Sequence, residues 1–337
     1  MVVFIHKTLV IVVLLLFSLF AQKKEQQQYT LRGYAQGTDY SIKYFAESPL
    51  VSGAEVDSIL LKIDSSMSLY KPYSLISQFN NTTRSFRMDH HFLRVINKSF
   101  EIYEATQGRF DITVAPLVQA WGFGPKPIAA FPDSTRIKEL LKNVGMDLLS
   151  IQGNELFKKQ PGVQIDLNGI AQGYSVDVVA DYLLHKGIRC FVVEIGGEIR
   201  MKGPKPDGTA MRVGIEGPAL NEQSEPQLRH VISFNEGAVT TSGNYRKYLQ
   251  AAGKKIAHLI NPKTGYPLDN RLISVTIFAK DALTADGYDN AVMAMSVEQA
   301  LAFVGANKNM EAYIIYHRKN GSVTDTLTAG FKKMIVN

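Results

Sequence analysis

The order of helical and strand-like segments is the feature that most restricts what this chain can fold into. Apolar residues at helical spacing predict helices, and alternation of apolar with polar residues predicts strands. In this sequence the two patterns follow one another without strict strand–helix–strand alternation, and no repeat or long linker divides them. The sequence therefore predicts an α+β fold, with mixed sheets and packed helices, rather than a doubly wound parallel sheet.

Capping residues and turn residues mark the individual elements. Ser52 with Glu55, and Ser296 with Gln299, form capping boxes ahead of apolar stripes. The helices are predicted from Ser52 to Pro72 and over residues 89–106, 134–144, 169–186, 284–295 and 297–304. The strands are predicted over residues 29–45 (two strands), 110–114, 148–167, 189–195, 211–216, 230–234, 238–241, 256–260 and 272–279, with a closing hairpin around residues 320–321.

The N-terminus has the layout of an export signal. His6 and Lys7 precede an apolar run over residues 9–20, and Ala21 and a polar stretch follow. The run is shorter than the roughly 20 residues of a membrane span, which favours a secretory signal cleaved after Ala21 over an uncleaved inner-membrane anchor. We assign residues 1–28 to a signal peptide or N-terminal anchor with a polar spacer and residues 29–337 to one exported domain. We expect a periplasmic or periplasm-facing, membrane-anchored location.

Cysteine content and charge restrict the class of protein further. Cys190 is the one cysteine, so no internal disulfide or cysteine-rich zinc site can form, and its apolar neighbours predict a buried strand residue. No cysteine stands at the cleavage point, so we do not expect a lipoprotein. The net charge of +6 is spread along the chain and no nucleic-acid-binding module accompanies it, so no nucleic-acid partner is predicted.

A first polar motif, DLNGIAQGY over residues 166–174, combines an acid with two glycines at a predicted strand-to-helix junction. Free amides at a helix N-terminus can bind an anion such as a pyrophosphate, and Gly169 would let a ligand or an ion approach the backbone closely. Alternatively, Asp166 or Asn168 simply caps the helix, and spacing alone favours this interpretation.

A second motif, TADGYDN over residues 284–290, gathers oxygen ligands on a predicted helix. Asp286 and Asn290 are four residues apart and share a helix face, with Asp289 beside Asp286. Oxygen ligands of this kind suit Mg²⁺. The alternative is an acidic first turn that interacts favourably with the helix dipole.

Two further segments carry isolated polar residues. His258 is predicted on a strand whose alternate residue is Ile260, and it is either a general base or a satisfied core histidine. Asp111 lies between Phe110 and Ile112, where an acid needs a polar partner; the alternative is a turn cap.

The sequence lacks the motifs of several common nucleotide-binding and metal sites. The sequence has no GxGxxG fingerprint, no P-loop lysine motif and no HExxH motif. Residues 68–71 (SLYK), 242–244 (SGN) and 263–265 (KTG) reproduce, in order, three short motifs of penicillin-recognising serine enzymes. This remains a remote alternative, because Ser68 follows the last turn of a predicted helix instead of opening one.

Taken together and in order, these segments resemble the ApbE family of FAD:protein FMN transferases. The matching segments are residues 36–38, 67–70, 77–80, 108–118, 121–125, 166–174, 194–197, 241–245, 258–267 and 285–286. No single segment is specific, whereas the ordered set, spread over about residues 30–328, is highly specific.

The resemblance implies a fold and an activity. The fold would be an ApbE-like, T-fold-like two-lobed single domain. The activity would be a Mg²⁺-dependent transfer of FMN from FAD, through a phosphoester, onto a Thr or Ser hydroxyl of a target protein, with release of AMP. The implied acceptor is a subunit of a membrane redox complex. An FAD pyrophosphatase, in which water replaces the hydroxyl, and a flavin-binding carrier are the alternatives that share the site.

The resemblance also implies roles for individual residues. His258 would lie closest to the chemistry, and the carbonyl of Gly169 and Asp286, with Asp289 or Asn290 nearby, would hold Mg²⁺. The implied FAD-binding residues are Gln36, Tyr70, Arg109, Phe110, Asp111, Asp166, Gln172 and Ile260.

Three positions depart from the family pattern. The family usually has methionine in place of Gln36, lysine in place of Gln172 and threonine in place of Asn290. Loss of the lysine removes a positive charge near the cofactor, whereas an amide oxygen can still ligate Mg²⁺.

Overall fold

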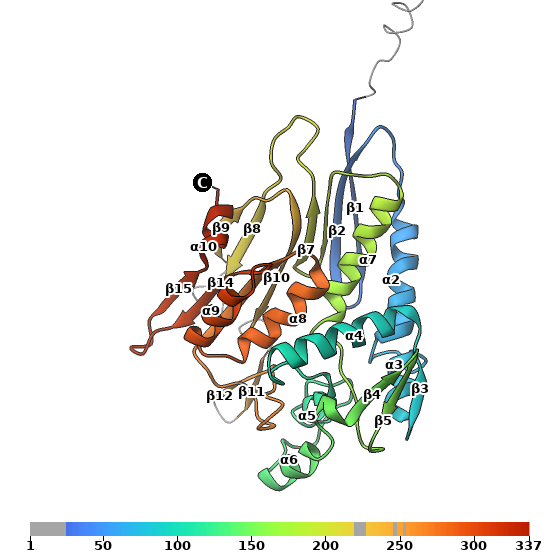
Figure 1. Ribbon diagram of the computed structural model, residues 1–337, viewed down its shortest axis with the longest axis vertical. Coiled ribbons are helices and arrows are strands. Elements are labelled where there is room, and N and C mark those ends of the chain that lie inside the picture. The colour runs from blue at the N-terminus through green and yellow to red at the C-terminus, as the bar shows by residue number, and fades with distance from the viewer. Residues whose placement is uncertain (1–24, 219–226, 245–247, 252–253, 337) are drawn as a thin grey trace, which may run out of the picture.

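An eight-stranded antiparallel sheet forms the centre of the molecule (Figure 1). The computed structural model describes residues 25–218, 227–244, 248–251 and 254–336, so the apolar run over residues 9–20 and its cleavage point lie outside the described residues. In spatial order the strands are β1 (Gln27–Ala35), β2 (Thr38–Ala46), β6 (Phe191–Ile195), β7 (Glu198–Lys202), β10 (Glu236–Gly243), β13 (Leu272–Ala279), β14 (Glu311–His317) and β15 (Val323–Leu327). All neighbouring strands are antiparallel, which confirms the α+β prediction.

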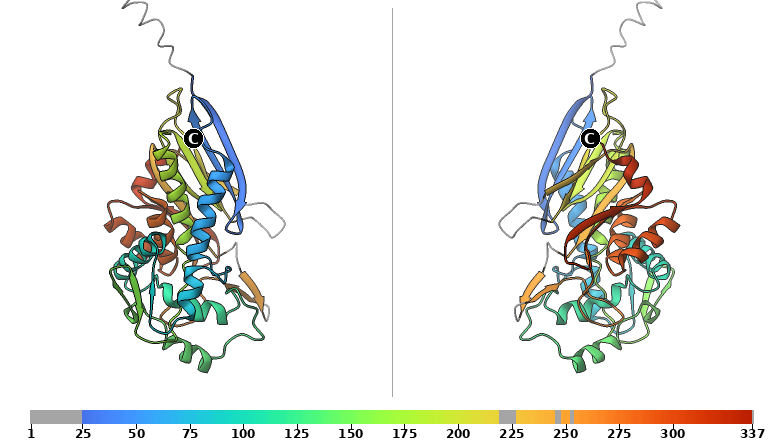
Figure 2. Two further views of the ribbon diagram at one scale, coloured as in Figure 1. Left: turned by 90° about the vertical axis from the view of Figure 1, so that its right-hand side faces the viewer. Right: turned by 90° about the vertical axis from the view of Figure 1, so that its left-hand side faces the viewer.

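Helices cover one face of this sheet (Figure 2). Between the helices and the sheet lies the main apolar core, in which Ile42, Val193 and Ile277 are fully buried. Helix α8 packs against both α7 and strand β10, and this three-way contact positions the site described below. The helices are α2 (Gly53–Met67), α4 (His90–Ala105), α7 (Ala171–His185), α8 (Ala282–Met293) and α9 (Val297–Ala306).

The opposite face of the sheet carries a second, smaller core. Strands β8 (Val213–Gly217) and β9 (Gln227–Ile232) and helix α10 (Ala329–Met334) contribute to it. Cys190 belongs to this core, and burial raises the pKa of its thiol to about 11. The cysteine is therefore buried as predicted, although it precedes β6 instead of lying within it.

A lower lobe extends from the main sheet (Figure 1). It contains a three-stranded sheet in the order β3-β5-β4, and Phe79 and Leu156 of this lobe belong to the main core. The two lobes therefore share one apolar core. The elements of the lobe are α3 (Leu75–Asn81), β3 (Ser85–Arg87), α5 (Ala115–Ala120), α6 (Ser134–Leu141), β4 (Leu149–Gln152) and β5 (Glu155–Lys158), with the hairpin β11 (Tyr248–Ala251) and β12 (Lys254–Ala257) beside it.

The predicted helix caps are confirmed. Ser52 Oγ accepts the Glu55 N–H at 3.3 Å, and Glu55 accepts the Ser52 N–H at 2.8 Å, so the capping box is complete. The same reciprocal pair forms between Ser296 and Gln299. These caps satisfy amides that the first helical turn leaves without partners, which is why the sequence located both helix starts.

Several predicted elements are wrong. Residues 110–114 form no strand, because Asp111 caps a 3₁₀ turn, Ile112–Val114, by accepting the Thr113 N–H at 2.8 Å. Within residues 148–167 only β4 and β5 are strands, and the strand predicted over residues 256–260 ends at Ala257. Helix α2 ends at Met67, well before Pro72, and no sequence pattern predicted the short helices α3 and α5.

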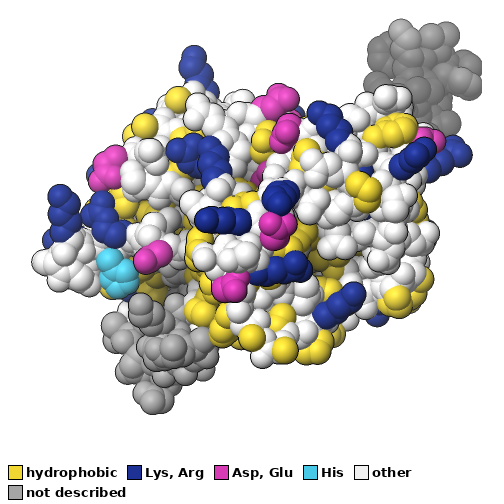
Figure 3. Space-filling view, turned by 90° about the horizontal axis from the view of Figure 1, so that it is seen from below, with side chains coloured by type: hydrophobic (Ala, Val, Ile, Leu, Met, Phe, Trp, Pro, Cys, Tyr) yellow, Lys and Arg dark blue, Asp and Glu magenta, His cyan; other side chains and the backbone are white. Residues whose placement is uncertain are grey.

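Two surface properties complete the description. No helix among the described residues is long and apolar enough to cross a bilayer. On the face seen from below, Lys and Arg side chains are dispersed, with acidic and uncharged side chains between them (Figure 3). This dispersal agrees with the even spread of charge along the sequence.

Candidate functional site

Helices α7 and α8 approach each other closely at Gly173. A β-carbon at this position would lie 2.3 Å from the Ala282 carbonyl oxygen and 2.7 Å from the β-carbon of Asp286. Because glycine lacks that atom, its N–H can donate a 2.8 Å hydrogen bond to Asp286 Oδ2. The first turn of α7 therefore directs a free amide at a carboxylate.

Asp286 and Asp289 form a buried acidic pair on α8. Asp286 is 4% exposed and Asp289 is 1% exposed. Burial raises the pKa of Asp286 to about 7, against the opposite effect of the Gly173 hydrogen bond. Burial also raises the pKa of Asp289 well above its usual range, and the charge of Asp286 raises it further. Two such carboxylates are stable together in their charged forms only when a cation balances them.

Asn290 joins this pair from the next position of α8. Its Nδ2 lies 3.1 Å from the Gly169 carbonyl oxygen, 3.0 Å from Asp289 Oδ1 and 3.4 Å from Asp286 Oδ1. The Ser242 hydroxyl, from β10, donates to Asn290 Oδ1 at 3.3 Å. All four residues predicted to hold a metal therefore lie together, and we call the Gly169 carbonyl and the three side chains the oxygen cluster.

The oxygen cluster fits a small, hard cation. One carbonyl and two carboxylates present oxygen ligands of the kind that Mg²⁺ prefers, and the Asn290 amide, which turns Nδ2 toward them and Oδ1 toward Ser242, carries a fourth oxygen. Thr240 is fully buried beside Asp289, and its hydroxyl lowers the pKa of that carboxyl against the effect of burial. The described residues contain no group of three or more His, Cys, Asp or Glu side chains placed to hold a metal, so the carbonyl and the amide would have to complete the shell.

Asp177 supports the cluster and was missed by the sequence analysis. It accepts the N–H groups of Ala282 at 3.0 Å and Leu283 at 2.8 Å, and Arg200 Nη1 lies 3.0 Å from it. The carboxylate thus ties the start of α8 to α7. Burial raises its pKa to about 6, and the Arg200 charge opposes this rise. The available signal was a lone acid inside an apolar helical stretch, residues 176–180.

Gln172 lies against the turn between β6 and β7. Its Nε2 donates to the Ile195 carbonyl oxygen at 2.9 Å and to Glu198 Oε2 at 2.6 Å. A β-carbon on Gly196, which has φ +62°, would lie 1.9 Å from this Nε2. The side chain at the position where the family usually has lysine is therefore already held by an acid, Glu198, that the sequence analysis did not single out.

Gln36 reaches the same region from the turn between β1 and β2. Its backbone φ is +55°. Its side chain hydrogen-bonds to Asp64, and this bond opposes the rise in the pKa of Asp64 that burial causes. The adjacent Thr38 lies close to Gly196. The β1–β2 turn, which carries Gln36, therefore lies close to the β6–β7 turn that Gln172 contacts from α7.

Asp111 and Asp166 lie on neighbouring backbone segments, because the Asp166 N–H donates to the Ile112 carbonyl at 2.7 Å. Asp111 accepts the Thr113 N–H, and Asp166 accepts the Asn168 N–H, each at 2.8 Å. Asp111 thus makes the turn cap that the sequence left open, whereas Asp166 only closes a local turn: the N-cap of α7 is Ile170, which makes no side-chain capping bond. Burial nevertheless raises the pKa of each carboxyl to about 6, against these hydrogen bonds.

The other residues predicted around Asp166 differ in exposure. Tyr70 is 63% exposed; partial burial of its hydroxyl raises its pKa, and the nearby charge of Asp166 raises it further. Phe110 is buried, and the Arg109 guanidinium donates to the Thr106 carbonyl at 3.2 Å. Tyr70, Asp111 and Asp166 therefore face one region, with Tyr70 at its solvent side.

His258 lies in a bend directly after β12 and is half-buried. Its ring is edge-on to Phe123, with the ring centroids 6.3 Å apart. Ile260 forms an isolated bridge with Pro267 and packs in a small core with Leu117. The prediction that strand alternation places His258 and Ile260 on one face is therefore wrong, because β12 ends before both residues.

The loop over residues 258–267 is attached to the lower lobe instead. Trp121 Nε1 donates to the Gly265 carbonyl at 2.8 Å, and the Trp121 ring lies near Tyr266 with centroids 6.1 Å apart. Aromatic packing on the segment after α5 thus positions the His258 loop.

The serine-enzyme alternative is not supported. Ser68 is the C-cap of α2, and Lys263 lies in a turn where its N–H donates to Asn261. Ser242 bonds to Asn290 instead. A nucleophilic serine of the first motif would have to open a helix, so the arrangement contradicts that reading.

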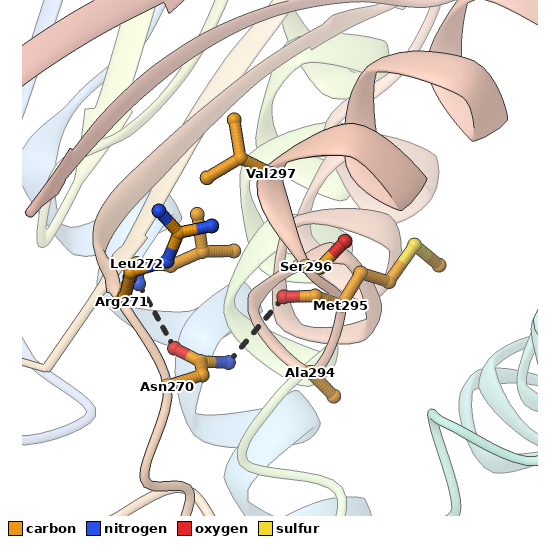
Figure 4. A pocket seen from close by; sticks show the side chains of 7 residues that line it. All are labelled: Asn270, Arg271, Leu272, Ala294, Met295, Ser296 and Val297. Atoms are coloured by element: carbon orange, nitrogen blue, oxygen red, sulfur yellow. Dashed lines mark hydrogen bonds between the residues drawn. The ribbon is translucent and has the colours of Figure 1, made fainter. Parts of the chain in front are cut away.

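Two surface cavities are separate features. One of about 270 Å³ lies between the start of β13 and the α8–α9 connection, lined by residues 270–272 and 294–297 (Figure 4). Its Asn270 amide is already paired, with the Leu272 N–H at 3.0 Å and the Met295 carbonyl at 3.5 Å. The other, of about 430 Å³, is lined by residues of α5, residues 128–133 and Arg136. Neither lining includes a predicted site residue.

Comparison with known proteins gives a consistent set of relatives. The family model described as "ApbE family" matches residues 36–314. The FAD:protein FMN transferase of Vibrio cholerae serotype O1 is 38% identical over 296 residues, which cover 85% of this chain and 87% of the relative. That of Haemophilus influenzae is 35% identical over 338 residues, 96% of each chain. The solved structure of the flavin transferase ApbE from Vibrio cholerae superimposes with a TM-score of 0.82 at 35% identity, covering 92% of this chain and 99% of that one.

Proposed function

The chain belongs to the ApbE family and is a transferase that takes FMN from FAD, and we propose that it does so with Mg²⁺ held at the oxygen cluster. One observation carries the proposal. A carbonyl, two buried carboxylates and an amide converge beside the first turn of α7, where the Gly173 amide already binds Asp286. Within this fold, that arrangement would provide a cation site beside the start of α7, where the helix dipole favours an anion such as a pyrophosphate.

The proposed reaction is a phosphoryl-type displacement. The hydroxyl oxygen of an acceptor Thr or Ser bonds to the phosphorus on the FMN side of FAD, the bond from that phosphorus to the bridging oxygen breaks, and AMP leaves. The acceptor proton passes to a base, because an unactivated hydroxyl is a weak nucleophile. When bound, Mg²⁺ would neutralise charge on the pyrophosphate.

We assign FAD binding to two groups of residues. Gln172 contacts the β6–β7 turn, and the β1–β2 turn that carries Gln36 lies close to the same turn through Thr38, so these two residues form the first group. Tyr70, Asp111 and Asp166, with the Arg109–Phe110 segment, form the second group, and Ile260 would contribute from the His258 loop. In Asp111 and Asp166, burial raises the pKa to about 6, so these carboxyls would readily accept or donate hydrogen bonds to a polar ligand.

We assign the base to His258. Its imidazole is half-buried, in a loop that Trp121 anchors, so a protein acceptor can reach it while the ring stays oriented against Phe123. Imidazole side chains ordinarily titrate near pH 6.5 and are mostly neutral at neutral pH, so they can accept a proton there.

The proposed acceptor rests on the family resemblance, and the proposed location rests on the N-terminal pattern. We propose that an exported enzyme, delivered or anchored by residues 9–20, modifies a subunit of a membrane redox complex outside the cytoplasm. The half-buried His258 loop, which a second protein could reach, is consistent with this role.

The proposal is tested with FAD, MgCl₂ and a purified candidate acceptor. We expect intact-mass measurement to show FMN added to the acceptor and chromatography to show an equal amount of AMP. AMP without labelled acceptor would indicate a pyrophosphatase, and FAD binding without AMP a carrier. The Thr→Ala variant of the acceptor site is the matched control and should remain unlabelled.

A further inference from the structure

Asn80, in the last turn of α3, belongs to a matched sequence segment, residues 77–80, to which the proposed function gives no role. We propose that Asn80 is a positioning residue of the FAD site. Its side-chain amide fixes the Ile165–Asp166 segment and so places the Asp166 carboxyl, which the proposed function assigns to FAD. The inference rests on that assignment and adds the residue that holds this acid in position.

The segment over residues 163–167 has the burial pattern of a strand but pairs with none. Val163, Ile165 and Leu167 are buried, and the two residues between them are half-buried, which is the alternation of a strand. No strand forms over these residues. Buried backbone N–H and C=O groups need hydrogen-bond partners, so another part of the chain has to provide them.

The side chain of Asn80 provides these partners. Its Oδ1 accepts the Ile165 N–H at 2.8 Å, and its Nδ2 donates to the Ile165 carbonyl at 2.9 Å. A side-chain amide carries the same kinds of donor and acceptor as a peptide group, so it can stand in for one residue of a neighbouring strand. The next N–H, that of Asp166, donates to the Ile112 carbonyl at 2.7 Å. The backbone is therefore held at two successive residues, the second of which carries the carboxyl.

Helix α3 is itself anchored at both ends. At its start, the fully buried Ser74 caps the first turn. At its end, Lys158 of β5 donates from Nζ to the Thr82 carbonyl at 3.0 Å and lies 4.4 Å from the centroid of the Phe79 ring. Lys158 is 7% exposed, and a positive charge is favourable at the C-terminal end of a helix. The Asn80 amide is therefore presented from a fixed helix end.

The Asn80 contact and the His258 loop lie on different parts of the site. Asp166 is close enough to Tyr70 for its charge to raise the pKa of that hydroxyl, so a shift of the Ile165–Asp166 segment would change both sides of the proposed FAD site. His258 is held instead through Phe123 and the Trp121 segment. Loss of Asn80 should therefore weaken FAD binding and leave the turnover of bound FAD nearly unchanged.

The first measurement compares two asparagines in the full chain, with FAD titrated in excess MgCl₂ and transfer measured at saturating FAD. Asn80→Ala should raise the Kd for FAD at least about tenfold and change kcat by less than about threefold. Asn270→Ala is the matched control, because Asn270 also accepts a backbone N–H, that of Leu272 at 3.0 Å, and donates to a carbonyl, that of Met293 at 2.6 Å, at the separate cavity (Figure 4).

Both variants should lower the Tm, since each leaves backbone groups without their partners. Only Asn80→Ala should change the Kd for FAD; the Kd of Asn270→Ala should stay within about threefold of the wild type. Equal changes in Kd in the two variants would overturn the proposal, because Asn80 would then contribute stability alone. A lower kcat at unchanged Kd would overturn it as well.

A second variant, Asn80→Asp, serves if Asn80→Ala does not fold. It keeps the size of the side chain and the oxygen that accepts the Ile165 N–H, but it sets a carboxylate oxygen against the Ile165 carbonyl. The Kd for FAD should again rise at least about tenfold.

A double-mutant cycle then identifies the residue through which Asn80 acts. Introduced into Asp166→Ala, the Asn80→Asp change should raise the Kd by less than about threefold. Equal fold-changes in the two backgrounds would overturn the proposal. Normal FAD binding by Asp166→Ala would refute both the proposed FAD site and this inference. Weak binding by Asp166→Ala together with normal binding by Asn80→Asp would refute this inference alone.

Discussion

The oxygen cluster and the His258 loop are held in place in different ways. The cluster is assembled from α7, α8 and β10, and its two acids are 4% and 1% exposed. His258 is half-buried in an irregular loop that is attached to the lower lobe by the Trp121–Gly265 hydrogen bond and by aromatic contacts. If both belong to the proposed site, the difference in how they are held means that they should respond differently to substitution. Changes in the cluster should affect metal binding and stability, whereas changes in the loop should affect the rate.

The largest effect is expected from Asp286→Ala in the cluster. It removes the carboxylate that binds the Gly173 amide and the proposed metal, so Mg²⁺-dependent FMN transfer should fall at least about 10³-fold while circular dichroism stays unchanged. Asp207→Ala, which removes an acid of an exposed turn, is the control and should transfer normally. Normal turnover of FAD by Asp286→Ala in excess chelator would show that the metal assignment is wrong.

The corresponding change in the loop is His258→Asn. Affinity for FAD and Mg²⁺ should be retained while transfer falls by about 10²-fold or more, because only proton acceptance is lost. The wild-type rate should rise with pH through an imidazole titration, and the variant should lose that limb.

His317→Asn, in the β14–β15 hairpin, is the matched control for the loop variant. A near wild-type rate in His258→Asn would remove this residue from the mechanism. Loss of FAD binding in His258→Asn would instead mean that His258 has a structural role, and the oxygen cluster and the His258 loop would then not differ in the way described above.

Gly173→Ala tests how tightly the cluster is packed. The added methyl would collide with the Ala282 carbonyl, so the free energy of unfolding should fall by about 1–3 kcal/mol in urea titrations, with loss of Mg²⁺ binding. Gly305→Ala, in α9, meets nothing within 4 Å and should instead stabilise the protein by up to about 1 kcal/mol. Equal effects of the two substitutions would contradict the close α7–α8 contact.

Asp166→Asn tests the raised pKa of this half-buried acid near Tyr70. The folded-state pKa of about 6 lies above the usual 3.8, so the folded protein binds this proton more tightly than the unfolded chain does. That contribution to stability is present below about pH 4 and is lost as pH rises through about 6. The neutral variant should therefore exceed the wild type by about 1–2 kcal/mol at pH 7 and match it at pH 4. A wild type that is the more stable protein at pH 7 would refute this.

The smallest effect is expected from Gln172→Lys. A cation beside the proposed pyrophosphate site should strengthen FAD binding by on the order of 1 kcal/mol. Glu198, 2.6 Å from the Gln172 amide, would pair with the new ammonium group and reduce the gain. The gain should therefore be larger in a Glu198→Gln background, as fluorescence titration of all four proteins would measure. If Gln172→Lys bound FAD more weakly both with Glu198 present and in the Glu198→Gln background, FAD binding would depend on the Gln172 amide itself.

Local patterns in the sequence were enough to locate several parts of this molecule. The capping boxes at Ser52 and Ser296, and the shared face of Asp286 and Asn290, depend on residues three or four apart, so periodicity alone predicts them. The resemblance to a family then brought the separate motifs into one hypothesis about flavin transfer.

Only the tertiary structure decided how those motifs meet. Asn290 and the Gly169 carbonyl are 121 positions apart, and Asp177 reaches the amides of α8 across 105 positions, so no local pattern records either contact. The prediction of a strand at His258 is wrong because a distant contact shapes this segment. The Trp121 indole donates to the Gly265 carbonyl from 144 positions away and holds the loop in place. Sequence periodicity shows which side of a helix or strand is apolar. The hydrogen-bond partner of a buried polar group depends instead on how the elements pack together, and leaving such a group without a partner costs free energy.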